Sequence, residues 1–424
     1  MKALFAVGFL LIGIYPVASQ EEGSDVNTCL MNAQYQKALE LIQGLEPSKE
    51  LLLQKTTCYK ALSNYSQATV ILESLSKEYP DDIPIKLELA SCYKETLSYP
   101  QGVQCYDELI QIDSTNLYFY IQKADLLYQS QQYYDAIAQY RYLEKDNPSA
   151  YSHKRLGMCY EKLNRVDSAL VHYARSQEID PEDNFTAISL IKMYIKQEDF
   201  KSAIEKSESF MERNPKNKQM NLLNAFAYYS IDQYEEAVKR FEKCRAEGDS
   251  TLMVNQGLGI SYYFLGNNEK AQPCLSRAYI QDTTNLKVLY PLAITSYETG
   301  LYKEAIEYYK KLLRSYLPNT KALLNLFSGL AKACEKEGRY YETVNSYEQA
   351  LKYAGDNDEM EILYDLANLL EHQLHQYGYA NHYFQKYRLS LYNYQLNLKD
   401  SVEVEAIEEK LNALDEHLEY LKSK

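Results

Sequence analysis

The sequence predicts an all-α fold in which short helical hairpins stack in a row. The first observation is that segments such as LYKEAIEYYKKLL (301–313) carry apolar residues at helical spacing, with charged residues between them. The second is that similar segments return at a nearly constant interval, for example QYYDAIAQYRYL (132–143) and QYEEAVKRFEKC (233–244). The third is that prolines follow several of these segments, where a helix should stop.

One small residue in the second helix of each hairpin sets the repeat. Between Ala68 and Ala305 this residue recurs every 34 residues, with a single interval of 33. A fixed period of this size indicates stacked supersecondary units. The full series is Ala38, Ala68, Gly102, Ala136, Ala169, Ala203, Ala237, Ala271, Ala305, Thr343 and Ala380.

A second small residue lies twelve positions earlier, in the first helix of most hairpins. Two helices approach closely only where side chains are small, so the two small positions should mark their crossing. The residues are Ala90, Ala124, Gly157, Ala225, Gly259, Ala293 and Ala331, with Thr56 and Ile191 as exceptions. Three residues later come aromatics that should fill the space between hairpins: Tyr59, Tyr93, Tyr160, Tyr194, Tyr228 and Tyr262.

Prolines mark the end of several hairpins. Pro80, Pro148, Pro181 and Pro215 lie twelve residues after the small residue of the second helix. Proline cannot continue a helix, because it lacks a backbone N–H and its ring clashes with the preceding turn. Each unit should therefore consist of a first helix, a short turn and a second helix that ends near the proline position.

This pattern resembles the tetratricopeptide repeat family. Two segments match the second helix of that family closely: QYEEAVKRFEKC and LYKEAIEYYKKLL. The resemblance implies a right-handed α-solenoid of about 11 stacked helix-turn-helix repeats. It extends over nearly the whole chain after the first residues. The family's carboxylate clamp for chaperone tails is not reproduced, since Lys154 is followed by Met158 where the clamp has Asn.

The chain should divide into five segments. We expect a signal peptide at 1–19, an irregular N-terminal repeat at 20–48 and a regular array at 49–319. Longer, divergent repeats should occupy 320–398, because the spacing stretches there to 38 and then 37 residues. A three- or four-residue excess is about one helical turn. An amphipathic helix should fill 401–424.

The first residues predict export. A basic Lys2 precedes an apolar run from Ala3 to Tyr15, and the small residues Ala18 and Ser19 follow, as at a signal cleavage site. The run is shorter than the roughly 20 residues needed to span a bilayer. We therefore expect a periplasmic or secreted protein, from a bacterium, without a membrane span after cleavage.

Charge and chemistry exclude several functions. The net charge of −14 at pH 7 disfavours binding to nucleic acid. The eight cysteines fall mostly at packed places of the repeat, so we expect small buried hydrophobes, with disulfides between neighbours as the alternative. No catalytic motif is found, and we expect no enzyme, cofactor or metal. A zinc site at His372, His375 and His382 is the weaker reading of a histidine-rich stretch.

An aromatic groove is the candidate binding site. Each repeat is numbered here so that the small residue of its second helix is place twenty. Places five, nine and twelve then fall on one face of the first helix, and between 218 and 319 they are largely apolar. With neighbouring Phe264, the groove residues are Leu222, Phe226, Tyr229, Ile260, Tyr263, Phe264, Tyr290, Ile294 and Tyr297. Such a surface could hold a partner segment, or its rings could pack on neighbouring repeats.

The last helix carries a seam of apolar residues at alternating spacings of three and four. The seam consists of Val404, Ile407, Leu411, Leu414, Leu418 and Leu421. It could cover the apolar end of the solenoid, or it could join two chains as a coiled coil, giving a homodimer.

These observations predict a scaffold or adaptor in the cell envelope that binds a partner protein of unknown identity in the aromatic groove. The alternative is a carbohydrate-binding envelope protein that uses tyrosine faces, since the chain has 43 tyrosines. The sequence favours the scaffold, because the expected insertions and lipid anchor of such carbohydrate-binding proteins are missing.

Overall fold

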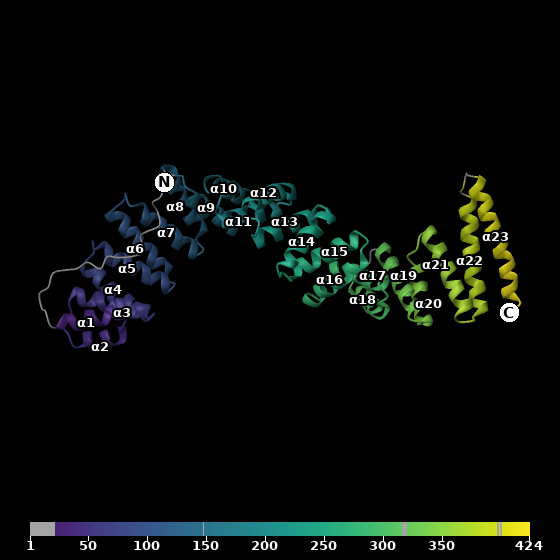
Figure 1. Cartoon of the computed structure of the whole chain (residues 1–424), viewed down its shortest axis with the longest axis horizontal. Helices are drawn as coiled ribbons and strands as arrows, with labels where there is room; N and C mark the ends of the chain where they lie inside the picture. The colour runs from purple at the N-terminus through teal and green to yellow at the C-terminus, as the bar shows by residue number, and fades with distance from the viewer. Residues whose placement is uncertain (1–21, 147, 316–319, 397, 399–400) are drawn as a thin grey trace. The chain divides into compact units, whose positions relative to one another are not determined.

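The computed structural model describes residues 22–146, 148–315, 320–396, 398 and 401–424, and every element in these ranges is an α-helix (Figure 1). The predicted signal peptide at 1–19 lies outside the described residues. The helices form two compact units, one ending at Gln197 and the other beginning at Glu198. This division within the regular array was not predicted.

The first unit contains five helical hairpins and one further helix, each packed on the next along the chain. Its helices are α1 (Glu22–Met31), α2 (Tyr35–Gln43), α3 (Lys49–Ala61), α4 (Tyr65–Glu78), α5 (Ile83–Glu95), α6 (Tyr99–Ile112), α7 (Leu117–Gln129), α8 (Tyr133–Asp146), α9 (Ala150–Lys162), α10 (Val166–Ile179) and α11 (Asn184–Lys196).

The second unit continues the same pattern and ends with a long helix packed on its predecessor. Its helices are α12 (Phe200–Arg213), α13 (Lys218–Ser230), α14 (Tyr234–Ala246), α15 (Leu252–Phe264), α16 (Asn268–Gln281), α17 (Leu286–Glu298), α18 (Tyr302–Ser315), α19 (Thr320–Lys336), α20 (Tyr340–Leu351), α21 (Asp356–His372), α22 (Tyr377–Leu396) and α23 (Ser401–Lys422).

The small residues lie where the sequence predicts the helices cross. The alanines of the second-helix series are all 0% exposed, as is Thr343. A Cβ added to Gly157 would lie 2.6 Å from the Tyr173 ring, and one added to Gly259 would lie 2.7 Å from Leu275. The two helices of these hairpins therefore approach too closely for a larger side chain.

Every hairpin turns through a residue with left-handed backbone, five positions before the small residue of its second helix. Leu97 has φ 58°, Gln131 has φ 63° and Asp232 has φ 60°, whereas Gly266 and Gly300 fill the same place elsewhere. Only glycine adopts this conformation without a steric cost. Several repeats thus keep a tight turn at the expense of local strain.

A hydrogen bond of constant register links successive hairpins. The hydroxyls of Tyr93, Tyr228 and Tyr262 each donate to a glutamate 20 residues earlier, at oxygen–oxygen distances of 2.6, 2.7 and 2.7 Å. The acceptors are Glu73, Glu208 and Glu242. These tyrosines were predicted to fill the space between hairpins, and they also bind the preceding repeat.

The predicted stops and lengthened helices are confirmed. Pro80, Pro148, Pro181 and Pro215 each lie just beyond the end of a second helix. In the C-terminal repeats the first helices α19 and α21 have 17 residues, against 13 in α13, and the second helix α22 has 20, against 13 in α14. The excess residues therefore extend the helices.

The cysteines are buried and free, as most of their positions predicted. All eight lie in the helical cores, and none forms a disulfide: Cys29, Cys58, Cys92, Cys105, Cys159, Cys244, Cys274 and Cys334. Burial raises the pKa of the Cys244 and Cys334 thiols to about 11. These thiols act as small apolar side chains in the packing.

The final helix packs on its own chain. Leu414, Leu418 and Leu421 are buried in a core shared with α21 and α22, and Ile407 and Leu411 are buried beside Leu391. Val404, the first residue of the seam, is partly buried. Arg388 on α22 also binds Asp415, with Nη2 2.8 Å from Oδ2. The seam is thus occupied within the chain, which is the arrangement that capping requires.

Candidate functional site

The predicted groove residues come from three first helices of the second unit. Leu222, Phe226 and Tyr229 lie on α13, Ile260, Tyr263 and Phe264 on α15, and Tyr290, Ile294 and Tyr297 on α17. Two of these helices have fixed starting points, because the side chains of Asn217 and Asn285 accept hydrogen bonds from backbone N–H groups in the first turns of α13 and α17.

The groove residues differ in exposure. Ile260 is buried, with 5% of its surface exposed, whereas Phe264 is 59% exposed. The other seven are partly buried. Leu222, Phe226, Tyr229 and Tyr263 pack against the buried core of α13–α16, while Tyr290 and Tyr297 pack against the core of α17–α19. Most of the groove side chains therefore pack against the hydrophobic core, and Phe264 is the most exposed of them.

Five rings form a connected aromatic strip, which consists of Phe226, Tyr229, Tyr234, Tyr263 and Phe264. Tyr234 stacks on Phe264 with ring centroids 4.7 Å apart and planes 9° from parallel. Tyr263 meets Phe264 edge to face at 5.3 Å, and Tyr229 contacts both Tyr234 at 6.4 Å and Phe226 at 6.2 Å. The strip therefore crosses from α13 and α14 to α15.

Sequence reasoning missed Tyr234, the first residue of α14. A signal was available, because most second helices begin with an aromatic residue: Tyr35, Tyr65, Tyr99, Tyr133, Phe200, Tyr234, Tyr302, Tyr340 and Tyr377. Similar ring contacts recur between Tyr128 and Tyr133 and between Tyr297 and Tyr302, both at 5.6 Å. In the α15–α16 hairpin this place is Asn268, and Phe264 instead reaches the preceding hairpin.

Three of the four groove tyrosines have raised pKa values and are neutral at physiological pH. Burial raises the pKa of Tyr229, Tyr263 and Tyr297 above the usual value of a phenol. They present apolar ring surface with hydroxyls that can form hydrogen bonds. This chemistry suits contact with a protein segment better than acid–base catalysis.

Charged residues at the corresponding places of other repeats are paired within the chain. Lys154 binds Asp183 with Nζ and Oδ2 3.0 Å apart, and Glu161 accepts a hydrogen bond from Tyr173 at 2.6 Å. In the second unit, Lys332 Nζ lies 3.1 Å from Glu361 Oε1. The Lys332–Glu361 ion pair joins α19 to α21, and the Tyr173–Glu161 hydrogen bond joins α10 to α9.

A polar network fills the equivalent face of the first unit. Asp125 on α7 accepts hydrogen bonds from Tyr151 at 2.8 Å and from Arg155 Nε at 2.9 Å, and it also binds Tyr140. The Arg155 guanidinium lies 5.0 Å from the centre of the Tyr128 ring. The network was not predicted, because it joins three helices at positions that no single motif connects.

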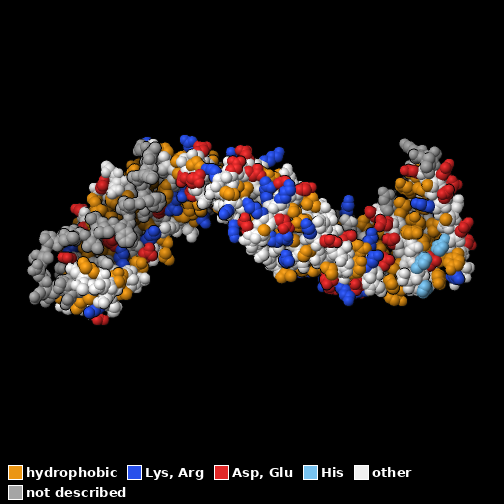
Figure 2. All heavy atoms as spheres, in the orientation of Figure 1, with side chains coloured by type: hydrophobic (Ala, Val, Ile, Leu, Met, Phe, Trp, Pro, Cys, Tyr) orange, Lys and Arg blue, Asp and Glu red, His pale blue; other side chains and the backbone are white. Residues whose placement is uncertain are grey.

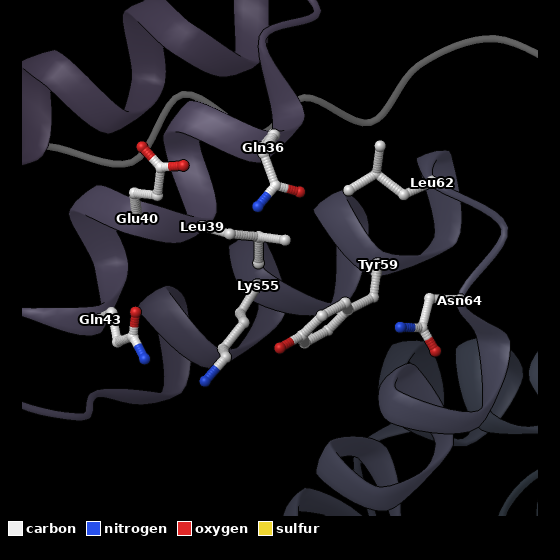
Figure 3. A pocket seen from close by; sticks show the side chains of 8 residues that line it. All are labelled: Gln36, Leu39, Glu40, Gln43, Lys55, Tyr59, Leu62 and Asn64. Carbon is white, nitrogen blue, oxygen red and sulfur yellow. The ribbon is translucent and has the colours of Figure 1, made fainter.

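A separate pocket lies between α2 and α3 (Figure 3). It is lined by Gln36, Leu39, Glu40, Gln43, Lys55, Tyr59, Leu62 and Asn64. Figure 3 shows Lys55 and the hydroxyl end of Tyr59 on the same side of this opening. The lining is mostly polar and supplies hydrogen-bonding groups without a nucleophile–base pair.

The histidines singled out in the sequence lie near the C-terminus, where Figure 2 shows histidine side chains over the last helices. The His372 side chain is 61% exposed, and its Nδ1 lies 3.1 Å from the carbonyl of Asn368. His375 occupies a turn with φ 54°, and His382 lies on α22. Among the described residues, they form no group of three converging metal ligands.

No helix in the described ranges is both long enough and apolar enough to cross a bilayer.

Two segments of the chain, 121–184 and 257–319, match the tetratricopeptide repeat family model. Tetratricopeptide repeat protein 1 of Schizosaccharomyces pombe is 26% identical over 211 residues, covering 46% of this chain and 20% of the relative. TPR repeat-containing protein YpiA of Bacillus subtilis is 21% identical, covering 65% of this chain and 74% of the relative.

Among solved structures, YrrB, described as a TPR protein with an unusual peptide-binding site, is 17% identical with a TM-score of 0.40. The match covers 44% of this chain and 97% of YrrB. The chain spans only 20% and 35% of the first two curated relatives that it matches. Residues 121–184 and 257–319 therefore carry tetratricopeptide repeats, and the stacked hairpins of the described residues follow the same pattern.

Proposed function

We propose that this chain is a non-enzymatic scaffold that binds a segment of another protein along the aromatic strip. The observation that carries the proposal is the exposed ring of Phe264, which Tyr234 holds in a stacked position beside Tyr229 and Tyr263. Exposed aromatic rings on a rigid base are typical anchors of protein interfaces. Helical repeat proteins commonly bind partners along such faces.

The strip favours a partner segment with apolar or aromatic side chains and a nearby positive charge. The faces of Phe264 and Tyr234 supply apolar contact, and the Tyr234 hydroxyl donates to Asp232 at 2.6 Å. The carboxylates of Asp232 and Glu235 lie at exposed positions on either side of Tyr234 in the sequence. A Lys or Arg of the partner could pair with them, giving orientation more than affinity.

Site-specific cross-linking tests this proposal. A photoreactive amino acid replaces Phe264 in one variant and Ile280, which is 75% exposed on α16, in a matched control. We expect cross-links to one protein from position 264, identified by mass spectrometry, and their loss when Tyr234→Ser is added. Equal cross-linking from positions 264 and 280 would show that the strip is not the binding site.

Carbohydrate binding is the second candidate. It is favoured by exposed tyrosines such as Tyr134, Tyr341 and Tyr379, whose exposed fractions are 62%, 73% and 66%. These rings lie on three different helices, α8, α20 and α22, so they supply no single stacking platform. Binding of the chain to saccharides on a glycan array, abolished by Tyr341→Ser or Tyr379→Ser, would favour this candidate over the scaffold.

We further propose that the chain acts outside the cytoplasm, in a bacterial periplasm or after secretion. The support is the sequence of residues 1–19 alone. Mass spectrometry of the protein from its native host should find a mature N-terminus at Gln20. Intact Met1 in most of the protein would contradict export by this route.

A further inference from the structure

Three potential metal ligands from successive helices of the first unit converge on one point. Glu144 comes from the last turns of α8, His153 from the first turn of α9 and His172 from the middle of α10. The repeat brings them together because α9 and α10 form one hairpin, and α8 of the preceding hairpin packs on α9.

The three ligand atoms lie at short distances from one another. His153 Nδ1 is 2.6 Å from Glu144 Oε1, the two Nδ1 atoms are 3.2 Å apart, and His172 Nδ1 is 4.0 Å from Glu144 Oε1. A triangle with these sides has a point about 2.0 Å from all three atoms, which equals the roughly 2.0–2.1 Å of zinc–histidine bonds. A tetrahedral ion with bonds of this length needs ligand atoms roughly 3.3 Å apart. The Glu144 and His172 side chains would therefore have to shift by less than about 1 Å to bind it.

The ligands are well shielded from water. The side chains of Glu144 and His172 are each 16% exposed, and that of His153 is 13% exposed. Glu144 Oε1 is buried and accepts no hydrogen bond of ordinary geometry, although His153 Nδ1 lies 2.6 Å from it. A metal ion would satisfy this oxygen.

One of the two imidazoles is positioned by a neighbouring aromatic ring. The His172 ring is held against the Tyr160 ring, with centroids 5.4 Å apart, which fixes its orientation.

We propose that Glu144, His153 and His172 form a binding site for a divalent transition-metal ion, with Zn²⁺ as the ion that best fits two imidazoles and one carboxylate. Three protein ligands leave the fourth position of a tetrahedral ion to water. The bound ion would join α8 to the α9–α10 hairpin, and so tie one repeat to the next. The competing arrangement is a metal-free hydrogen bond between the two imidazoles.

Calorimetric titration of the full chain with ZnCl₂, after treatment with EDTA, tests the site. We expect one Zn²⁺ per chain with a Kd at or below about 1 μM. His172→Gln should weaken binding at least ~100-fold, since removal of a ligand should cost at least as much as loss of an outer-shell partner. His382→Gln, in the histidine-rich stretch of the second unit, is the control and should leave binding unchanged.

A second measurement keeps the test decisive if His172→Gln fails to fold. Co²⁺ added to the EDTA-treated wild-type chain should give the visible absorption of a tetrahedral site, and Glu144→Gln should shift or abolish it. Zinc should also raise the melting temperature of the wild-type chain, because it binds only the folded state. Absence of stoichiometric zinc and cobalt binding, or loss of binding in His382→Gln, would overturn the proposal.

Discussion

Tyr234 at the start of α14 and Phe264 at the end of α15 stack face to face, so the strip depends on contact between two successive hairpins. Phe264 is mainly exposed, while Tyr234 is partly buried. The two residues should therefore respond differently to substitution: loss of Phe264 should affect binding, and loss of Tyr234 should also affect the fold.

Phe264→Ser should weaken binding of a partner peptide about tenfold or more, because it removes an exposed aromatic anchor. Its effect on the free energy of unfolding should stay within about 1 kcal/mol, since more than half of the ring is exposed. Peptides selected from a displayed random library on the wild-type chain provide the probe, measured by fluorescence anisotropy. Ile280→Ser is the matched control and should bind as the wild type does.

The free energy of unfolding should fall at alkaline pH because several tyrosines have raised pKa values in the folded state. Burial, together with the hydrogen bond to Glu208, raises the pKa of Tyr228 to about 12 in the folded state. The folded state therefore keeps this proton after the unfolded chain, with a phenol pKa of about 10, has lost it. The resulting stability is fully present below about pH 10 and is lost as the pH rises through about 12.

Urea unfolding at pH 8, 10 and 11 measures this effect. The free energy of unfolding should fall by up to about 1.4 kcal/mol per pH unit for each such tyrosine above pH 10. Tyr228→Phe should reduce the slope, while Tyr341→Phe, which alters a 73% exposed ring, should not. A stability that stays flat to pH 11 would contradict the assigned role of these buried hydroxyls.

Leu97→Gly should stabilise the chain by about 0.5–1 kcal/mol. Leu97 is 68% exposed with φ 58°, so it makes few contacts while its Cβ is strained. Removing the Cβ relieves about 1–2 kcal/mol of strain, partly offset by the greater entropy of glycine in the unfolded chain. Val171→Gly, at an exposed site in the middle of α10, should instead destabilise by about 1 kcal/mol. Thermal unfolding of both variants would show opposite shifts.

Leu418→Ala should destabilise the C-terminal repeats by about 2–4 kcal/mol, because the side chain is 5% exposed in a core shared with α21 and α22. Hydrogen exchange should show lost protection in these helices, with little change in the first unit. If the seam caps the chain, the mass in solution should be the same for the wild type and this variant. A halved mass for the variant would indicate that the seam joins two chains.

The repeated parts of the fold could be predicted from the sequence because each rests on local rules. Ala237 and Ala271 must be small where helices cross, and Pro215 must end a helix. The lengthened helices α19 and α21 followed from the wider spacing of the last small residues. The small residue of the second helix recurs in every hairpin, so its period stands out from the rest of the sequence.

Contacts between side chains of different helices were harder to predict. Phe264 was recognised as a groove residue, but its partner Tyr234 was not, because their contact depends on how two hairpins stack. Histidines close in sequence, His372 and His375, were considered as metal ligands, while His153 and His172 meet across a helix crossing. The glutamates that bind Tyr93 and Tyr262 could have been found from their constant separation of 20 residues.

Because each of these tyrosine–glutamate bonds joins a hairpin only to its immediate predecessor, mechanical load applied at one place should be resisted link by link. Pulling the chain from its ends should then give a series of small, similar rupture events in place of one large one. A protein of this kind could stretch and recover while most of its length stays ordered.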